Sequence, residues 1–541
     1  MVTVTVKSNN PIFLRAVALA SLLVCADSRW CVAQEAKTAS TDASWKKLCT
    51  QALNRQRRLI FNNDGNEPVY FCKAATEEEL LKSRTSPLAG SQVDSIFYCT
   101  WSSGFGLFTH DTKAGQVFNT REAMFKENRT QEFLDHGIDP LRVMVKFGHA
   151  HKMEIFWSMR MNDTHDGARA EYGPVMFRAN KLKQEHPEYL IGSKEKPPKH
   201  GAWSAVDYGV PEIRELAFRY CEEVCTNYDV DGIELDFFRH AFFFKCSGPG
   251  EPCGETELAQ MTDLLRRIRA ITETAGRNKG APILLAVRVP DSVPYCKLIG
   301  LDLENWLADG LLDLLIVGGY TQLNPWEYSV KLGHKYGVKV YPSLDEPRVR
   351  DAAANQLRAS LETYRGRAMN AWAAGADGIY LFNFFDPHSP LWHELGDPKA
   401  LQSLDRNYFL SPRGPGSMPV PHQAFLNVPT LNPASPISIT TNQPARLALP
   451  LYEPRANHGL KDAPKRILLR AQFKKPPAPE QLLFRLNNNE LAGGKLAENW
   501  LEFELPLALT GQDNNTLEIS SRRSAKTAVV LTDLYVAIVG K

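Results

Sequence analysis

Short apolar runs alternate with longer segments of helical period from about residue 57 to residue 384. The clearest unit has three parts. Residues 211–228 place apolar side chains at i, i+3, i+4 and i+7, which predicts a helix, and residues 256–275 repeat that pattern, with Gly276 as the expected C-cap. Between them, residues 229–240 form a short apolar strand that ends in polar residues. Helix, buried strand and helix in this order are typical of a parallel α/β fold.

The same alternation predicts seven further strands, at residues 57–64, 94–101, 154–163, 283–291, 312–320, 338–346 and 378–384. Helical segments fit between them, and no GxGxxG turn is present. Eight strand–helix units of this kind favour a closed barrel over an open doubly wound sheet. The predicted fold class is therefore α/β, a (β/α)8 TIM barrel.

The pattern changes after Asp405. Residues 409–454 are rich in Pro, Ser and Asn, which is typical of a linker. Beyond them, short alternating runs separated by turn residues predict an antiparallel β-sandwich. The expected domains are a barrel at 45–408, a linker at 409–454 and an accessory β-sandwich at 455–541.

Residues 1–33 have the order of a secretory signal peptide. Lys7 and Arg15 precede an apolar run at 16–25, and small residues follow at 31–33. The apolar run is too short to span a bilayer, and no other segment approaches membrane length. We therefore expect a secreted or periplasmic protein without a membrane span.

Composition narrows the partners and the disulfides. Against 63 Lys and Arg stand 61 Asp and Glu, and a net charge of +2 gives no field for nucleic acid. Of ten cysteines, eight would remain after signal removal, and Cys246 and Cys253 flank a short loop as the best candidate disulfide. Cys221 and Cys225 lie one helical turn apart and are expected to be core residues or partners of other cysteines.

Acidic residues lie where predicted strands end, and in a barrel these ends meet around one mouth. Glu234 and Asp236 are two apart in one strand, so both point to the same face. Glycoside hydrolysis needs two carboxyl groups roughly 5 to 9.5 Å apart. Asp236, the outer of the two, is the predicted nucleophile or base, whereas Glu234 lies deeper and is expected to pair with Arg160 or Arg288.

Three residues compete for the role of general acid, and the sequence does not rank them: Asp291, Asp345 and Glu346. Other rim residues offer apolar platforms or hydrogen bonds to sugar hydroxyls. The predicted substrate-binding residues are Asp64, Trp101, Arg160, Asn162, Glu234, His240, Arg288, Tyr320 and Asn383. No cysteine spacing matches a zinc site, and we expect neither a metal nor an organic cofactor.

Four motifs in chain order carry a family resemblance: residues 150–157, 206–215, 229–237 and 375–380. Together they resemble the bacterial glycosyl-hydrolase-like barrels near glycosyl hydrolase-like family ten, over about residues 50–400. The resemblance implies a (β/α)8 barrel acting on carbohydrate, with Asp236 in the position that several glycosidase clans use for catalysis. The central motif is also similar to the chitinase signature. However, Phe238 occupies the position of its acid Glu and Glu234 replaces an Asp, so chitinase chemistry is not expected.

Three functions follow. The first is an exported glycoside hydrolase that cleaves a poly- or oligosaccharide by carboxylate chemistry. The second is a carbohydrate-binding pseudoenzyme, in which the catalytic pair is absent and Trp101, Trp203 and Tyr320 hold the sugar. The third is a metal-assisted hydrolase or lyase on the same barrel, which requires a cluster of Asp, Glu or His ligands.

Overall fold

The structure is a computed structural model that describes residues 42–414, 423–440, 442–451, 466–478, 481–506, 515–522 and 528–540. The predicted signal peptide, residues 1–33, lies outside these residues. Within the described ranges, no helix is both long and apolar enough to cross a membrane.

Eight parallel strands close into a barrel, which confirms the predicted fold class. Each strand pairs with its neighbour, and β1 pairs with β10 to complete the ring. The strands are β1 (Leu59–Asn63), β2 (Val93–Tyr98), β5 (Glu154–Arg160), β6 (Gly232–Asp236), β7 (Leu284–Val289), β8 (Leu314–Val317), β9 (Lys339–Leu344) and β10 (Ile379–Leu381).

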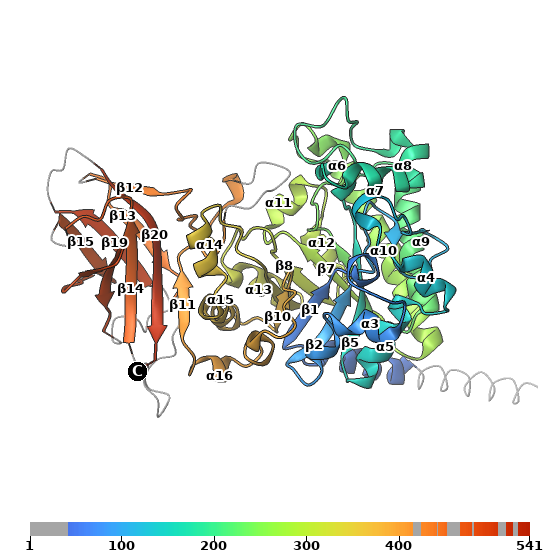
Figure 1. Cartoon of the computed structure of the whole chain (residues 1–541), viewed down its shortest axis with the longest axis horizontal. Helices are drawn as coiled ribbons and strands as arrows, with labels where there is room; N and C mark the ends of the chain where they lie inside the picture. Colours follow the sequence, from blue (N-terminus) through green and yellow to red (C-terminus); the bar gives the residue numbers. More distant parts are fainter. Residues whose placement is uncertain are drawn as a thin grey trace, which may run out of the picture.

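Helices surround the barrel (Figure 1). The longer ones are α5 (Pro140–Ala150), α9 (Pro211–Asn227), α10 (Glu255–Lys279), α13 (Trp326–Lys335) and α15 (Leu361–Ala373). Shorter ones are α2 (Glu67–Tyr70), α3 (Glu77–Lys82), α4 (Thr130–Asp135), α6 (His165–Ala168), α7 (Gly173–Ala179), α8 (Lys181–Glu185), α11 (Val293–Leu298), α12 (Leu303–Ala308), α14 (Ala352–Arg358) and α16 (Pro398–Leu401). A two-stranded sheet, β3 (Leu107–Phe108) with β4 (Gln116–Val117), lies in the loop after β2.

Helix α10 corrects one prediction, because Gly276 is not its C-cap. The helix continues to Lys279, and Gly280 ends it with a φ of 73°. Gly276 is required for a different reason. A Cβ there would lie 2.9 Å from the carbonyl oxygen of Ala281, so only glycine lets the following chain turn back against the last turns of the helix.

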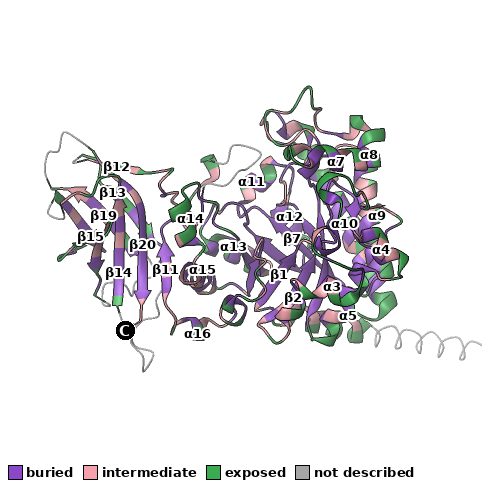
Figure 2. Cartoon of the chain, in the orientation of Figure 1, coloured by how far each residue is buried: buried purple, intermediate pink, exposed green. Residues whose placement is uncertain are grey.

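The barrel interior contains an apolar cluster below its mouth. Inward-facing side chains such as Phe97, Phe156 and Tyr380 form one cluster, in which the rings of Phe97 and Phe156 stack 4.4 Å apart. Gly232 makes room for them, since a Cβ at this position would meet the Phe156 ring at 2.2 Å. Figure 2 shows the strands buried and the outer helix faces exposed. The polar ends of the strands therefore lie above a packed core rather than a channel.

The C-terminal part is an antiparallel sandwich, also as predicted. One sheet has the order β11-β20-β14-β18-β17, with β12 also paired to β20, and the other has the order β13-β19-β15-β16. The strands are β11 (Arg406–Phe409), β12 (Ile437–Ile439), β13 (Ala445–Leu449), β14 (Arg466–Phe473), β15 (Leu482–Leu486), β16 (Asn489–Glu490), β17 (Lys495–Ala497), β18 (Trp500–Glu504), β19 (Asn515–Ser521) and β20 (Val529–Val539). Strands β12 and β13 come from the range predicted as a linker, where short strands lie among turn residues.

The sandwich packs on α14 and α15 through β11 and β20 (Figure 1). Arg358 of α14 is fully buried there and donates from Nη1 and Nη2 to Asp533 of β20, at 2.8 and 2.7 Å. The chain after β11 then returns to the barrel, where Arg413 Nη2 lies 2.7 Å from Asp345 Oδ2. The sandwich is thus joined to the barrel by buried ionic contacts, and one of them lies at the end of β9.

Candidate functional site

A hollow of about 650 Å³ opens at the carboxyl ends of the barrel strands. We call it the mouth pocket and define it by the residues that line it, which come from the loops after β5, β6, β8, β9 and β10. Four of the thirteen predicted site residues are among them: His240, Tyr320, Glu346 and Asn383. This is the location that a parallel barrel provides for a ligand.

Positive groups outnumber carboxylates in the lining. Arg169, Arg239 and Arg348 contribute guanidinium groups, whereas Glu346 is the sole lining carboxylate among the described residues. Glu346 Oε1 accepts a hydrogen bond from Arg348 Nε at 2.8 Å and one from Asn383 Nδ2 at 3.4 Å. The carboxylate that is accessible at the mouth is therefore already ion-paired.

Asp236 lies beneath this lining, with 1% of the residue exposed. Arg288 donates to it from Nε at 3.0 Å and from Nη2 at 2.7 Å. The backbone N–H groups of Phe238 and Arg239 also donate to its Oδ1, each at 2.9 Å. Asp236 thus anchors the start of the loop whose side chains line the pocket, and both of its oxygens are bound by Arg288.

Glu234 lies one layer deeper and is fully buried. Its Oε2 accepts hydrogen bonds from Ser158 Oγ at 2.5 Å and from Tyr380 Oη at 3.1 Å. Burial, and then the negative charge of Asp236, raise the pKa of Glu234 to about 8, so the carboxyl is protonated at neutral pH. The expected pairing of Glu234 with Arg160 or Arg288 is wrong, because both guanidinium groups bond to aspartates instead.

Arg160 joins two carboxylates at the end of β5. It donates from Nη2 to Asp64 Oδ1 and from Nη1 to Asp163 Oδ2, the latter at 3.3 Å. Burial alone would raise the pKa of Asp64, but the Arg160 and Arg239 charges hold it below its ordinary value. Asp64 and Arg160 therefore form part of a buried ionic layer under the pocket.

Asp291 and Asp345, two of the predicted acids, are buried and do not line the pocket. Asp291 accepts backbone hydrogen bonds from Leu323 and Asn324 at 2.9 to 3.0 Å, which holds the loop after β8. Asp345 Oδ2 accepts a hydrogen bond from Nη2 of Arg413, which lies in the chain segment after β11. Burial raises the pKa of each carboxyl to about 6.

Trp101 and Asn162 also lie away from the lining. The Trp101 ring stacks on Phe118 at 5.6 Å within a small apolar cluster. Asn162 Nδ2 donates to the carbonyl oxygens of Val206 and Phe242, at 2.9 and 2.7 Å, and so ties two loops together. These contacts support the loops that carry the pocket, and neither side chain reaches its surface.

One group of side chains has the spacing of metal ligands. Within the described residues, Asp163, His165 and His240 place three potential ligand atoms within 4.8 Å of one another. The group fits a cation poorly. His165 Nδ1 lies 2.8 Å from Asp163 Oδ2, and Arg239 Nη2 lies 3.1 Å from His165 Nε2. With Arg160 also bonded to Asp163, two guanidinium groups already provide positive charge where an ion would have to bind.

His240 presents a hydrogen-bond donor to the pocket. Its Nδ1 accepts from the backbone N–H of Thr164 at 3.2 Å, so its proton is on Nε2 when the ring is neutral. Burial lowers the pKa of His240 well below its ordinary value, and burial likewise lowers that of His165. Neither ring therefore adds a positive charge at neutral pH.

The predictions missed His165, Arg169, Arg239 and Arg348 as lining residues. A signal was available for three of them, because His165 follows the end of the predicted strand 154–163 by two positions. Arg239 immediately precedes the predicted His240, and Arg348 follows Glu346 by two positions, so a search of the residues around each strand end would have included all three. Arg169 belongs to a long loop whose path the pattern does not indicate.

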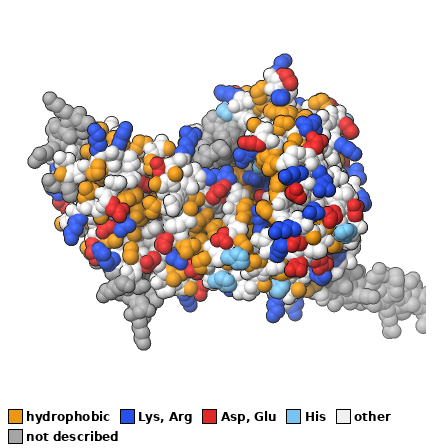
Figure 3. All heavy atoms as spheres, in the orientation of Figure 1, with side chains coloured by type: hydrophobic (Ala, Val, Ile, Leu, Met, Phe, Trp, Pro, Cys, Tyr) orange, Lys and Arg blue, Asp and Glu red, His pale blue; other side chains and the backbone are white. Residues whose placement is uncertain are grey.

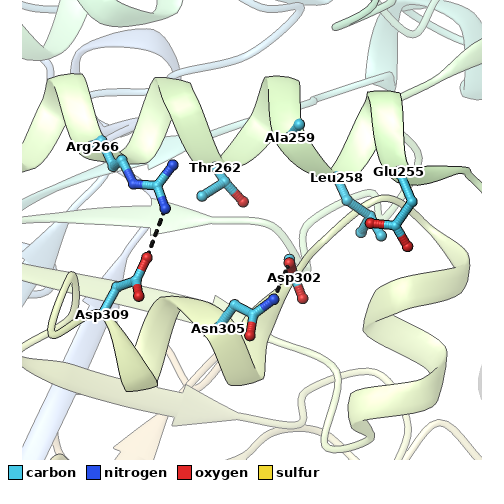
Figure 4. Close-up of a pocket in the computed structure, with 8 residues that line it drawn as sticks. All are labelled: Glu255, Leu258, Ala259, Thr262, Arg266, Asp302, Asn305 and Asp309. Atoms are coloured by element: carbon cyan, nitrogen blue, oxygen red, sulfur yellow. Dashed lines mark hydrogen bonds and ion pairs between the residues drawn. The ribbon is translucent and has the colours of Figure 1, made fainter.

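A second hollow, of about 340 Å³, lies between α10 and α12 on the outside of the barrel (Figure 4). Its charged groups include Arg266 and Asp309, which pair with each other at 2.7 Å. Asp302 accepts from Asn305 at 2.7 Å. No aromatic side chain and no predicted site residue lines this hollow, so the mouth pocket is the candidate site.

No family model matches the sequence, and no curated protein matches it. Similar solved structures include the GH36 α-galactosidase AgaA from Geobacillus stearothermophilus, with 10% identity and a TM-score of 0.37, covering 86% of this chain and 56% of that one. The α-L-fucosidase isoenzyme 2 from Paenibacillus thiaminolyticus is also similar, with 13% identity and a TM-score of 0.38, covering 64% of this chain and 49% of that one.

A third similar structure is the glycoside hydrolase family 18 N-acetylglucosaminidase from Paenibacillus barengoltzii, with 13% identity and a TM-score of 0.35, covering 64% of this chain and 99% of that one. The chain spans about half the length of the galactosidase and the fucosidase. All three neighbours are glycoside hydrolases by name. At these scores the likeness carries no argument about activity, and the barrel rests on the strand topology itself.

Proposed function

We propose that this protein binds a saccharide in the mouth pocket. The observation that supports it is the pocket's position and lining, since hydrogen-bonding groups from five strand–helix loops converge on one hollow. His240 offers an N–H, Asn383 an amide, and the arginines several more donors. A ligand rich in hydroxyl groups can use many such donors at once, and the hollow is large enough for a few sugar units.

Binding is tested by titrating a panel of oligosaccharides into the protein by calorimetry. Ala202→Trp fills the mouth pocket without removing a polar group, and we expect it to abolish binding. The matched control is Ala259→Trp, which places the same bulk in the hollow between α10 and α12. Loss of binding in the control alone, or binding of no saccharide by the unmodified protein, would overturn the proposal.

Hydrolysis of a glycosidic bond is the second candidate function. It is supported by Asp236, which lies at the carboxyl end of β6 directly below Phe238 and Arg239. For hydrolysis, we propose that Asp236 acts as nucleophile or base and that Glu346, the lining carboxylate, acts as general acid. Asp291 and Asp345 are assigned no step, because neither lines the pocket, whereas Glu346, the third candidate acid, does.

Release of reducing ends from the saccharides that bind distinguishes the two functions. Glu346→Gln is the decisive variant, because its side chain is half-exposed and its loss disturbs little of the fold. Abolished turnover with binding preserved supports hydrolysis. Absence of turnover in the unmodified protein on every bound saccharide rejects it and leaves a binding protein. Asp236→Asn is read together with thermal unfolding, because it also removes the partner of Arg288.

We also propose that the protein is exported. The signal-peptide pattern supports this, and so does the Cys246–Cys253 disulfide, whose Cα atoms lie 5.7 Å apart. Cys221 and Cys225 are buried in α9 without a disulfide, as expected of core residues. Fractionation of a bacterial host that expresses the chain with and without residues 1–33 tests export, and an equal cytoplasmic pool for both forms would contradict it.

A further inference from the structure

Arg239 brings a positive charge to the mouth pocket without a carboxylate partner of its own. Among the described residues it forms no ion pair, and its Nε has no hydrogen-bond partner. Its Nη2 donates to the neutral His165 ring at 3.1 Å. A guanidinium group held in a partly desolvated position is costly unless an opposite charge reaches it.

The carboxylates that surround Arg239 are already committed. Asp64 and Asp163 both bond to Arg160, and Asp236 bonds to Arg288 on both oxygens. Burial, and then the neighbouring Arg160 charge, lower the pKa of Arg239, to about 10. The side chain is still cationic at neutral pH, and no carboxylate of the described residues lies within ion-pair distance of it, so its free N–H groups can bond to an anion that enters the pocket.

Arg348 borders the same volume. Its Cζ lies 4.2 Å from the centroid of the Tyr320 ring, and the Cζ of Arg239 lies 5.6 Å from that same centroid. Arg348 also has a φ of 53°, in the left-handed region that a residue with a side chain rarely adopts. Such strain is typical of residues held in place at ligand sites.

The excess of positive charge is local to the pocket. The whole chain has a net charge of only +2. In Figure 3, basic and acidic side chains are interspersed over the face of the barrel that it shows. In the mouth pocket, by contrast, three arginines face one carboxylate, and Arg348 already pairs with it. General surface charge does not account for this arrangement.

We propose that the saccharide bound in the mouth pocket is anionic, and that its carboxylate or sulfate ester is held by Arg239 and Arg348. This rests on the proposed function and names its ligand class. Guanidinium groups suit the role because their planar N–H donors can bond both oxygens of a carboxylate or sulfate at once. Nη atoms of Arg239 and Arg348 supply these bonds, while His240 and Asn383 bind sugar hydroxyls.

The test compares three probes by calorimetry: an oligogalacturonate, the same oligosaccharide with its carboxyl groups reduced to alcohols, and a sulfated oligosaccharide of similar length. We expect an anionic probe to bind at least about tenfold more tightly than the reduced one, because charge-assisted hydrogen bonds are the stronger kind. Raising the salt concentration should weaken this preference. The anionic probe that binds more tightly identifies the group as carboxylate or sulfate.

Arg348→Gln and Arg239→Gln should each reduce that preference by about tenfold, because the anionic probe loses a charge-assisted hydrogen bond and so loses more affinity than the reduced probe does. Arg178→Gln is the matched control, since Arg178 is exposed, pairs with Glu122 at 2.7 Å and is not part of the pocket lining. Arg348 is partly exposed, so its variant keeps the test valid if Arg239→Gln does not fold.

Three results would overturn the inference, and they differ in what else they reject. If the reduced probe binds as tightly as both anionic probes, the ligand class is wrong but saccharide binding stands. If no probe binds, charged or neutral, the proposed function fails and this inference fails with it. A preference that persists in both arginine variants also overturns it, because other groups must then recognise the anion.

Discussion

The two layers of charge at the barrel mouth differ in how they are neutralised. In the buried layer, aspartates such as Asp236 and Asp64 have a guanidinium partner, in the pairs Asp236–Arg288 and Asp64–Arg160. In the lining layer directly above, the guanidinium groups of Arg239 and Arg169 have no carboxylate partner among the described residues. Carboxylates at strand ends can thus serve to hold the loops, while residues a few positions later determine what the pocket can bind.

The largest expected loss of unfolding free energy comes from a substitution in the buried layer. Asp236→Asn leaves the Arg288 charge buried without a counter-charge, and we expect the free energy of unfolding to fall by about 3 to 5 kcal/mol. Urea unfolding followed by circular dichroism measures this. The control is Asp309→Asn, which breaks the exposed pair with Arg266 and should cost less than about 1 kcal/mol. Similar losses in both variants would contradict a distinction between the layers.

Glu234 gives the next largest effect, through pH. Its pKa in the folded chain is about 8, against an ordinary value of 4.5. Below the ordinary value both states are protonated, and between the two values only the folded chain keeps the proton. The contribution of Glu234 to stability is therefore complete at low pH and is lost as the pH rises towards 8, by about 1.4 kcal/mol per pH unit.

Glu234→Gln keeps the size and removes the titration. The slope of unfolding free energy against pH between 6 and 8 should therefore be flatter in the variant than in the parent, while other titrating groups affect both equally. Urea midpoints at pH 6, 7 and 8 provide the comparison. Parallel slopes would mean that Glu234 ionises normally in the folded protein.

Substitutions in the lining layer should change the free energy of unfolding much less than substitutions in the buried layer. Arg348 and Glu346 have side chains that are 35% and 49% exposed, so water and salt screen their attraction. We expect Arg348→Gln to change the free energy of unfolding by no more than about 0.5 kcal/mol, measured by urea unfolding. A loss as large as that of Asp236→Asn would place Arg348 in the structural layer and leave it unsuited to ligand binding.

The fold could be predicted from the sequence because strand and helix periods are local signals. Seven of the eight barrel strands lie within the predicted ranges, and β2 begins one residue earlier than predicted, at Val93. The change to an antiparallel sandwich was also predicted. Strands β12 and β13 were missed because turn residues surround them. The C-cap of α10 was placed too early because Gly276 has the residue type of a cap but serves a tight contact.

The site could be predicted less well, for a physical reason. Period-two alternation indicates that Glu234 and Asp236 point inward, but it does not indicate how deep the mouth is. Which carboxylate meets a guanidinium depends on partners brought by distant strands, such as Arg288 from β7 and Arg413 from beyond the barrel. The sequence therefore identifies which residues lie at the mouth of the barrel. Only the packed structure shows which of them are buried and which line the pocket.

The smallest expected effect concerns Tyr320, at the boundary between the layers. Its hydroxyl is buried and has no hydrogen-bond partner among the described residues. Tyr320→Phe removes a desolvated polar group and keeps the ring against Arg348, so stability should be unchanged or rise by less than about 1 kcal/mol. Ser158→Ala is the matched comparison, because that hydroxyl donates to Glu234 and its loss should cost about 1 kcal/mol. If urea unfolding shows equal losses for the two variants, the Tyr320 hydroxyl has a partner after all, and the boundary between the layers lies closer to the surface.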